Sequence, residues 1–181
     1  GGKNLKLVSG LGSISASDNL NNLGTLTLQD GALFLASAGN ATFNGAVNAT
    51  ALVTYDTAYN LSLLGGGTIT GNTTLRNTGA LALGDSAGDI LTFTNGLNAT
   101  AASAITTGGT ISTTNKNLTL GDFSTTASTT FGAGTGVITL GAATIGTGTT
   151  LTLGAGGAGA INITTVEDGS GTGGLTLASA G

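Results

Sequence analysis

Apolar residues recur at every second position within short segments of this chain, and small polar residues separate the segments. The clearest segment is a Leu-x-Leu motif followed by a turn residue, which appears at residues 5–7, 26–28, 81–83, 118–120, 151–153 and 175–177. In an extended strand, alternate side chains face opposite sides, so both leucines of a motif point one way and the middle residue points the other. Spacing of i and i+2 predicts strands, because an amphipathic helix repeats its apolar residues at i, i+3 and i+4.

Longer stretches repeat the same motifs in the same order. Leu-x-Leu-Gly-Asp occurs at residues 81–85 and 118–122, and Gly-Gly-Thr-Ile occurs at residues 66–69 and 108–111. The six motifs named above begin 21, 55, 37, 33 and 24 residues apart. Constant elements joined by connections of variable length indicate a repeat architecture, in which each unit stacks on the next.

Strands of three residues are too short to be stable alone, but stacked coils let each strand pair with its copies in neighbouring coils. Gly, Asn-Gly and Asp-Gly turns bound the segments, and the chain has no Pro to interrupt a ladder. We therefore predict an all-β, parallel and right-handed β-helix, or β-solenoid, built of irregular short-strand repeats. Residues 1–181 would form a single continuous segment, as a fragment or subunit of a longer array. At roughly 20–27 residues per coil the chain supplies about seven to nine coils.

A β-sandwich of short antiparallel strands is the alternative fold. The repeated order of the motifs argues against it, because sandwich strands have no reason to repeat one another.

Composition excludes several functions. The 181 residues include 34 Gly but no His, Cys, Pro, Met or Trp, and 7% are charged, against about 25% in an average soluble domain. Without Cys the chain has no disulfides, thiolate metal sites or thiol chemistry. Four basic residues cannot neutralise several phosphates, so we expect no nucleic acid partner. Gly and Thr interrupt every apolar run before the ~18 residues of a transmembrane helix.

Two aspartates are candidate metal ligands. Asp85 and Asp122 follow the repeated Leu-x-Leu-Gly motif, so stacking of the motifs would bring them to one edge of the rod. A Ca²⁺ ion could bridge two such carboxylates, although a third copy of the motif has Ala155 at this position. We otherwise expect no metal and no cofactor.

Two further motifs resemble binding loops only superficially. Residues 154–159 match Gly-x-Gly-x-x-Gly, but β-branched residues follow in place of the helix that a dinucleotide site needs. Residues 168–172 alternate polar and Gly residues like a calcium loop, but lack the bidentate Glu of an EF-hand. We interpret both as Gly-rich turns.

The acidic residues give no clear catalytic pair. Glycan-cleaving enzymes use paired carboxylates, yet the chain has no His and a single Arg76 to tune such a pair. We expect no enzyme and no catalytic residues. The longest interval between Leu-x-Leu motifs contains Tyr55, Asp56 and Tyr59, and loops that project from a solenoid often carry its binding face. These three residues are the candidate contact loop, with core packing of the tyrosines as the alternative.

The phrases Asn-Leu-Thr-Leu-Gly at residues 117–121, Thr-Ile-Thr-Gly at 68–71 and Gly-Thr-Gly-Thr-Thr-Leu-Thr-Leu-Gly at 146–154 resemble those of known repeat proteins. They are similar to bacterial autotransporter passenger domains and to filamentous-haemagglutinin-like adhesins, and the resemblance extends from Leu5 to Ala178. It implies export across an outer membrane, a right-handed β-helix stalk, and a role in adhesion, aggregation or surface coating. It carries over no catalytic residues.

The expected function is that of a non-catalytic structural or adhesive segment, secreted or at the cell surface. Its partners would be further repeats of the same chain, a second copy, or host-surface or glycan ligands. One alternative is a homopolymeric filament or sheath subunit that stacks end to end. Another is a glycan-processing β-helix enzyme, and a last one is ice binding through outward rows of Thr.

Overall fold

A computed structural model of the chain describes residues 2–29, 39–156, 159–169 and 171–178. The described residues form a parallel β-solenoid of about seven turns without a helix. The prediction of an all-β parallel solenoid is therefore confirmed, and the antiparallel sandwich is excluded. No helix that could cross a membrane occurs in the part of the chain that the structure describes.

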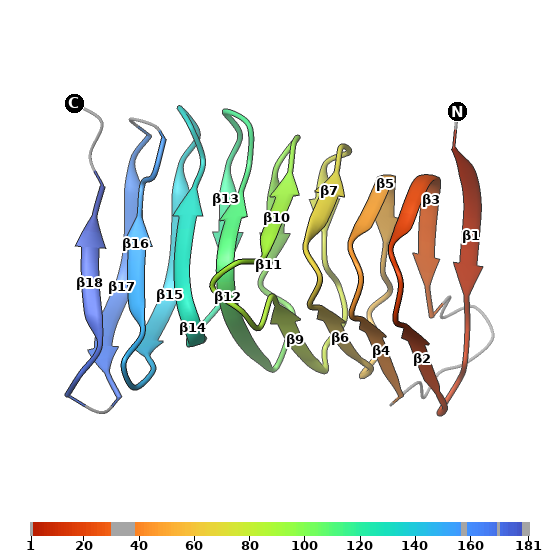
Figure 1. Ribbon diagram of the computed structural model, residues 1–181, viewed down its shortest axis with the longest axis horizontal. Coiled ribbons are helices and arrows are strands. Elements are labelled where there is room, and N and C mark those ends of the chain that lie inside the picture. Colours follow the sequence, from red (N-terminus) through yellow and green to blue (C-terminus); the bar gives the residue numbers. More distant parts are fainter. Residues whose placement is uncertain (1, 30–38, 157–158, 170, 179–181) are drawn as a thin grey trace.

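Eighteen strands make up the described coils. They are β1 (Lys3–Leu7), β2 (Ser13–Ala16), β3 (Leu20–Leu28), β4 (Asn40–Phe43), β5 (Val47–Val53), β6 (Asn60–Leu63), β7 (Gly67–Ile69), β8 (Thr73–Thr74), β9 (Ala80–Leu83), β10 (Ile90–Phe93), β11 (Leu97–Ala99), β12 (Ala104–Ser112), β13 (Leu118–Leu120), β14 (Phe123–Gly132), β15 (Ile138–Ile145), β16 (Thr150–Leu153), β17 (Ile161–Asp168) and β18 (Gly174–Leu177). The coils follow one another along the long axis, with the two chain ends at opposite ends of the rod (Figure 1).

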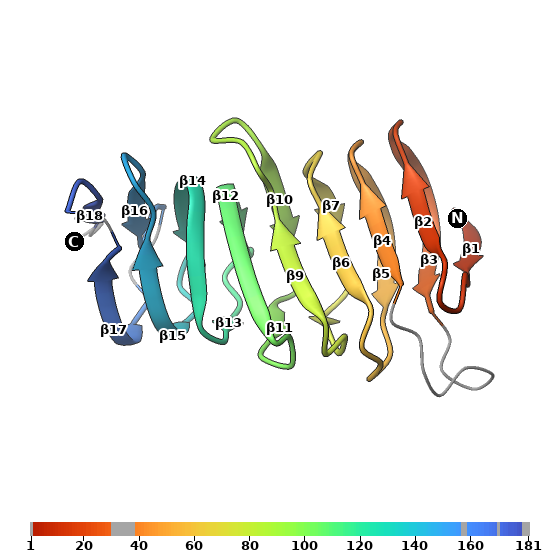
Figure 2. The same cartoon turned by 90° about the horizontal axis from the view of Figure 1, so that it is seen from below.

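Each coil contributes strands to three faces, which the pairings between coils define. Face 1 contains β2, β4, β6 and β9, the first halves of β12 and β14, and the second halves of β15 and β17. Face 2 contains the first halves of β3 and β5, then β7 and β10, the second halves of β12 and β14, and β16 and β18. Face 3 contains β1, the second halves of β3 and β5, then β8, β11 and β13, and the first halves of β15 and β17. Figure 2 shows neighbouring strands of face 1 side by side.

The core is a column of apolar side chains that runs through the coils. On face 1, Leu61 pairs with Leu81, Leu81 with Ile105, and Ile105 with Phe123, and all four are buried. The leucines at 118, 120, 151 and 153 are each at most 2% exposed, as the alternating pattern predicts. The intervening threonines at 119 and 152 are half-buried on the outer surface.

The Leu-x-Leu motifs do not mark a single position of the coil. Those at residues 5–7, 26–28 and 118–120 lie on face 3, the one at 81–83 lies on face 1, and those at 151–153 and 175–177 lie on face 2. The motif specifies a strand with two inward leucines, and all three faces require such strands. The interval between motifs therefore measures whole coils only when both motifs lie on the same face.

Side-chain oxygen atoms complete the hydrogen bonding where a coil turns a corner. The backbone N–H of Thr25 donates to Asn4 Oδ1 of the preceding coil at 2.9 Å, and the N–H of Ala80 donates to Asn60 Oδ1 at 2.8 Å. A corner interrupts the backbone ladder, so an N–H there needs another acceptor. The same arrangement joins Asn19 to Ala46, Asn115 to Thr135, Asn117 to Val137 and Asp122 to Ala142. Asn48 Oδ1 accepts the N–H of Thr68 in the same way, but within strands β5 and β7.

Candidate functional site

The candidate contact loop lies between β5 and β6, and its three residues differ in exposure. Asp56 is exposed and Tyr55 is half-buried, but Tyr59 is fully buried. Burial raises the pKa of the Tyr59 hydroxyl above its ordinary value, and the nearby Tyr55 backbone and Thr54 side chain lower it by less. Core packing, the alternative weighed from the sequence, therefore applies to Tyr59, and of the three candidate residues only Tyr55 and Asp56 present surface at this loop.

The two candidate calcium ligands lie at different corners of the solenoid. Asp85 follows β9 on face 1, whereas Asp122 follows β13 on face 3. The prediction that they share one edge is wrong, because their Leu-x-Leu motifs belong to different faces. Asp122 Oδ1 instead accepts a hydrogen bond of 2.8 Å from the N–H of Ala142. Within the described ranges, no three His, Cys, Asp or Glu side chains gather as metal ligands.

Both Gly-rich motifs belong to connections between strands. Residues 154–156 and 159 lead into β17, a strand where a dinucleotide site would need a helix; residues 157 and 158 lie outside the described residues. Asp168 Oδ2 accepts a hydrogen bond of 3.1 Å from the N–H of Gly173, which closes the turn before β18. The hydrogen bond agrees with the interpretation of the second motif as a turn, and the strand that follows the first motif disagrees with a dinucleotide site there.

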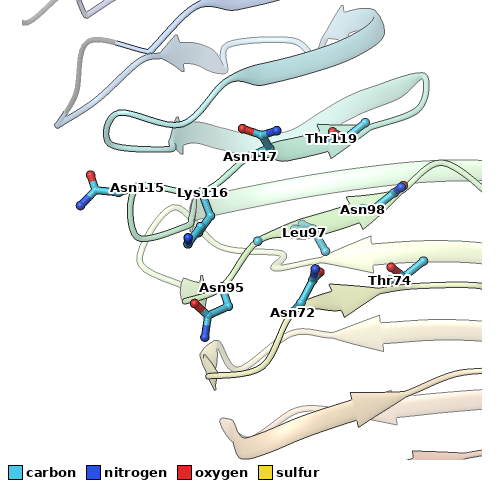
Figure 3. Close-up of a pocket in the computed structure, with 10 residues that line it drawn as sticks. Asn72, Thr74, Asn95, Leu97, Asn98, Asn115, Lys116, Asn117 and Thr119 are labelled. Atoms are coloured by element: carbon cyan, nitrogen blue, oxygen red, sulfur yellow. The ribbon is translucent and has the colours of Figure 1, made fainter.

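A surface pocket of about 450 Å³ crosses three successive coils on face 3 and its adjoining corner (Figure 3). We call it the asparagine pocket, because five of its ten residues are asparagines. Its lining consists of Asn72, Thr74, Asn95, Gly96, Leu97, Asn98, Asn115, Lys116, Asn117 and Thr119. The first two come from the coil of β8, the next four from the coil of β11, and the last four from the coil of β13.

Hydrogen bonds to the scaffold fix several of these amide groups. Asn115 Oδ1 accepts a hydrogen bond from the N–H of Thr135, and Asn117 Oδ1 accepts one from the N–H of Val137, both at 3.1 Å. A backbone N–H can bond only to the oxygen of an amide, so the orientation of both side chains is determined. The Nδ2 groups of Asn115 and Asn117 are consequently the parts of these amides that remain as donors.

The backbone of Asn115 also contributes to the shape of the pocket. Its φ is +56°, a left-handed conformation that Asn adopts more readily than most residues other than Gly. This conformation turns the chain sharply just before β13 and leaves Lys116 exposed at the pocket.

The side chains that line the pocket are mostly polar and uncharged, and none of them is Asp, Glu or His. Amide, hydroxyl and ammonium groups instead offer hydrogen bonds to a polar ligand. Sequence reasoning missed this pocket because its asparagines belong to three separate coils. The available signal was the Asn-Lys-Asn run at residues 115–117 immediately before a Leu-x-Leu motif.

Comparisons of the chain with models of protein families, with curated proteins and with solved structures found no match.

Proposed function

We propose that the chain is a non-catalytic extracellular rod, a structural or adhesive segment that is secreted or displayed at a cell surface. The observation that carries this proposal is the stacking of mostly small side chains outside one continuous apolar core. On face 1 the outward row runs through residues 15, 42, 62, 82, 106, 124 and 144, which are all Ser, Thr or Ala, and continues to Glu167. Such a row gives a long, uniform and well-solvated surface.

The resemblance of the sequence to autotransporter passenger domains and filamentous-haemagglutinin-like adhesins supports the same proposal. In those proteins a right-handed β-helix stalk provides length, and surface features along it make contacts. A solenoid with variable connections and constant faces is compatible with that division of roles.

The positions of the acidic side chains favour this role over that of a glycan-processing enzyme. Asp89 Oδ2 accepts hydrogen bonds from the N–H groups of Asp85 and Ser86, at 3.0 and 2.9 Å. Asp122 is bonded to the next coil, at another corner. The carboxylates of Asp89 and Asp122 thus stabilise turns at different corners, whereas glycan hydrolysis needs two carboxylates facing one bond.

A filament or sheath subunit that stacks end to end is the second candidate. The side chains of Leu175 and Leu177 are 47% and 66% exposed, although both leucines belong to inward positions of β18. Among the described strands β18 pairs only with β16, and β1 only with β3. Further coils of the same chain or a second copy would cover these edges.

Electron microscopy and an adhesion assay together test the two candidates. Separate short rods that retain coated beads on a cell or polysaccharide surface would support the adhesive role. Long unbranched fibres would favour the filament. Turnover of a polysaccharide by the purified chain would contradict the non-catalytic proposal.

A further inference from the structure

The asparagine pocket presents a donor-rich edge formed by three consecutive residues. Asn115 and Asn117 use their amide oxygens to bind the next coil, which leaves their Nδ2 donors for a ligand. Lys116 lies between them, is exposed, and adds an ammonium group with three donors and no acceptor. The Asn-Lys-Asn edge is therefore complementary to negatively charged oxygen atoms.

The remainder of the pocket offers a mixture of donors and acceptors. Asn95 Nδ2 donates to the carbonyl oxygen of Thr70 at 2.7 Å, so its Oδ1 remains as an acceptor. Asn98 Oδ1 accepts a hydrogen bond of 3.2 Å from the hydroxyl of Thr100, which leaves its Nδ2 as a donor. Thr74 and Thr119 add hydroxyl groups that can donate or accept. Sugar hydroxyls, which also donate and accept, match this surface.

The charge and the length of the asparagine pocket restrict the class of ligand further. The chain carries a net charge of −4, yet the pocket contains a lysine and no carboxylate, so it differs in sign from the molecule as a whole. Its three coils extend over about 10 Å, given a spacing of ~4.8 Å between paired strands. Such a length accommodates a stretch of sugar chain, whereas a small anion would contact only the Asn-Lys-Asn edge.

We propose that the asparagine pocket binds an acidic polysaccharide, with a sugar carboxylate at Lys116 and sugar hydroxyls on the surrounding amides. This inference gives the adhesive role a ligand class and rests on that proposed function. No aromatic side chain lines the pocket, so binding lacks stacking and depends on hydrogen bonds and one charge. A single pocket therefore binds weakly and loses affinity as salt increases. Several copies on one polysaccharide would bind with higher avidity.

The test is a titration of the ¹⁵N-labelled full chain with a linear trimer of galacturonic acid, followed by NMR. We expect the amide signals of residues 95–98 and 115–119 to shift, while those of residues 161–164 stay in place. The methyl ester of the same trimer, which lacks the charge, should bind at least several-fold more weakly. Acetate at equal ionic strength should not reproduce the shifts, because it carries a carboxylate but no sugar.

Two variants with matched controls connect the binding to the pocket. Lys116→Gln should weaken binding roughly five- to tenfold, since it removes a charge-assisted hydrogen bond, whereas Lys3→Gln removes the same charge at the end of the rod and should not. Asn98→Asp places a carboxylate in the pocket and should also weaken binding. Asn162→Asp is its control, because residues 98, 119, 139 and 162 form one outward row of face 3 and Asn162 lies outside the pocket.

Three results would overturn the inference: equal affinity for the methyl ester, identical shifts with acetate, or full affinity of Lys116→Gln. The proposed adhesive function can be refuted independently of the proposed ligand class. A rod that adheres without binding the trimer would refute only the ligand class, and a rod that binds the trimer but forms fibres and does not adhere would refute the function.

Discussion

The Oγ1 atoms of Thr125 and Thr149 lie 2.6 Å apart inside the solenoid, although the two residues belong to different coils. Thr149 donates its hydroxyl proton to the carbonyl oxygen of Gly146 at 2.9 Å. Thr125 must therefore donate to Thr149, and its own Oγ1 accepts the N–H of Gly146, also at 2.9 Å. The two hydroxyls thus bind both the N–H and the carbonyl oxygen of one residue at a corner.

Thr125→Val should lower the free energy of unfolding by about 1–3 kcal/mol, because it removes the acceptor for the N–H of Gly146 and a donor to Thr149. Thr125→Ser retains both hydrogen bonds and should lower the free energy of unfolding by less. Urea denaturation followed by circular dichroism measures both variants. Equal stability of Thr125→Val and the parent chain would show that water replaces the hydroxyl at this corner.

Leu120→Asp should destabilise the rod by several kcal/mol, because it places a carboxylate in the apolar column. Thr119→Asp adds the same charge one position earlier, on the outer surface, and should change stability by less than about 1 kcal/mol. Thermal unfolding compares the two variants. Similar melting temperatures for both would contradict the assignment of inward and outward positions.

The inward and outward positions could be predicted from the sequence because alternation is a local property of a strand. Leu118 and Leu120 must share a side whatever surrounds them. The face that a strand joins is not local, since it depends on how many residues each corner uses. Asp85 and Asp122 follow the same motif and nevertheless lie at different corners for this reason. A further Leu-x-Leu motif at residues 61–63 lies on face 1 beside the motif at 81–83. Because both are on one face, the interval between them gives the coil length of about 20 residues more directly than the other intervals do.

The candidate site could be predicted less well than the fold. Tyr55, Asp56 and Tyr59 lie together in one connection, but exposure depends on the packing of neighbouring coils, which buries Tyr59. The asparagine pocket combines side chains from three coils, so its composition follows from the register between coils. That register depends on pairing between residues about 20 positions apart in the sequence. No single segment therefore shows it.

Tyr59→Phe should leave the stability unchanged or raise it by about 1 kcal/mol at neutral pH. Among the described residues, none makes a hydrogen bond of normal geometry with the buried Tyr59 hydroxyl, so its loss removes a desolvated polar group. Tyr59→Ala, in contrast, should cost about 3–5 kcal/mol through the cavity it creates.

Alkaline pH provides a second measurement on Tyr59. Because burial raises the pKa of Tyr59 in the folded chain, the parent should lose stability as pH rises above about 10, where the unfolded tyrosine ionises. The Tyr59→Phe variant should lose less stability over the same pH range. An identical pH dependence of the two chains would contradict the burial of this hydroxyl.

Asp89→Asn should leave the fold intact, because an amide oxygen can replace the carboxylate oxygen that accepts the N–H groups of Asp85 and Ser86. Asp89→Ala removes that acceptor and should cost about 1 kcal/mol. Denaturation curves separate the two variants.

A combined replacement of residues 85, 89 and 122 by Asn should likewise preserve the fold and any binding. Loss of a polysaccharide hydrolase activity in that variant would contradict the structural role of these carboxylates.

The isolated chain should associate through its terminal strands, since unpaired strand edges bind other edges. Sedimentation velocity should show larger species as the concentration rises. Leu177→Lys on β18 should suppress them, whereas Ile90→Lys should not, because Ile90 is a comparably exposed apolar residue (61%) in the middle of the rod. A chain that stays monomeric at high concentration would contradict end-to-end association.

The pairing of each coil with only its two neighbours determines how the molecule responds to force. Hydrogen bonds between coils run along the rod, so a pull on its two ends acts on them in their own direction, on three faces at once. When one coil yields, it releases about 20 residues, or roughly 70 Å of extended chain, before the next coil carries the load. A rod anchored at one end and attached at the other would therefore lengthen in steps under a sudden pull, and its attachment would experience a limited peak force.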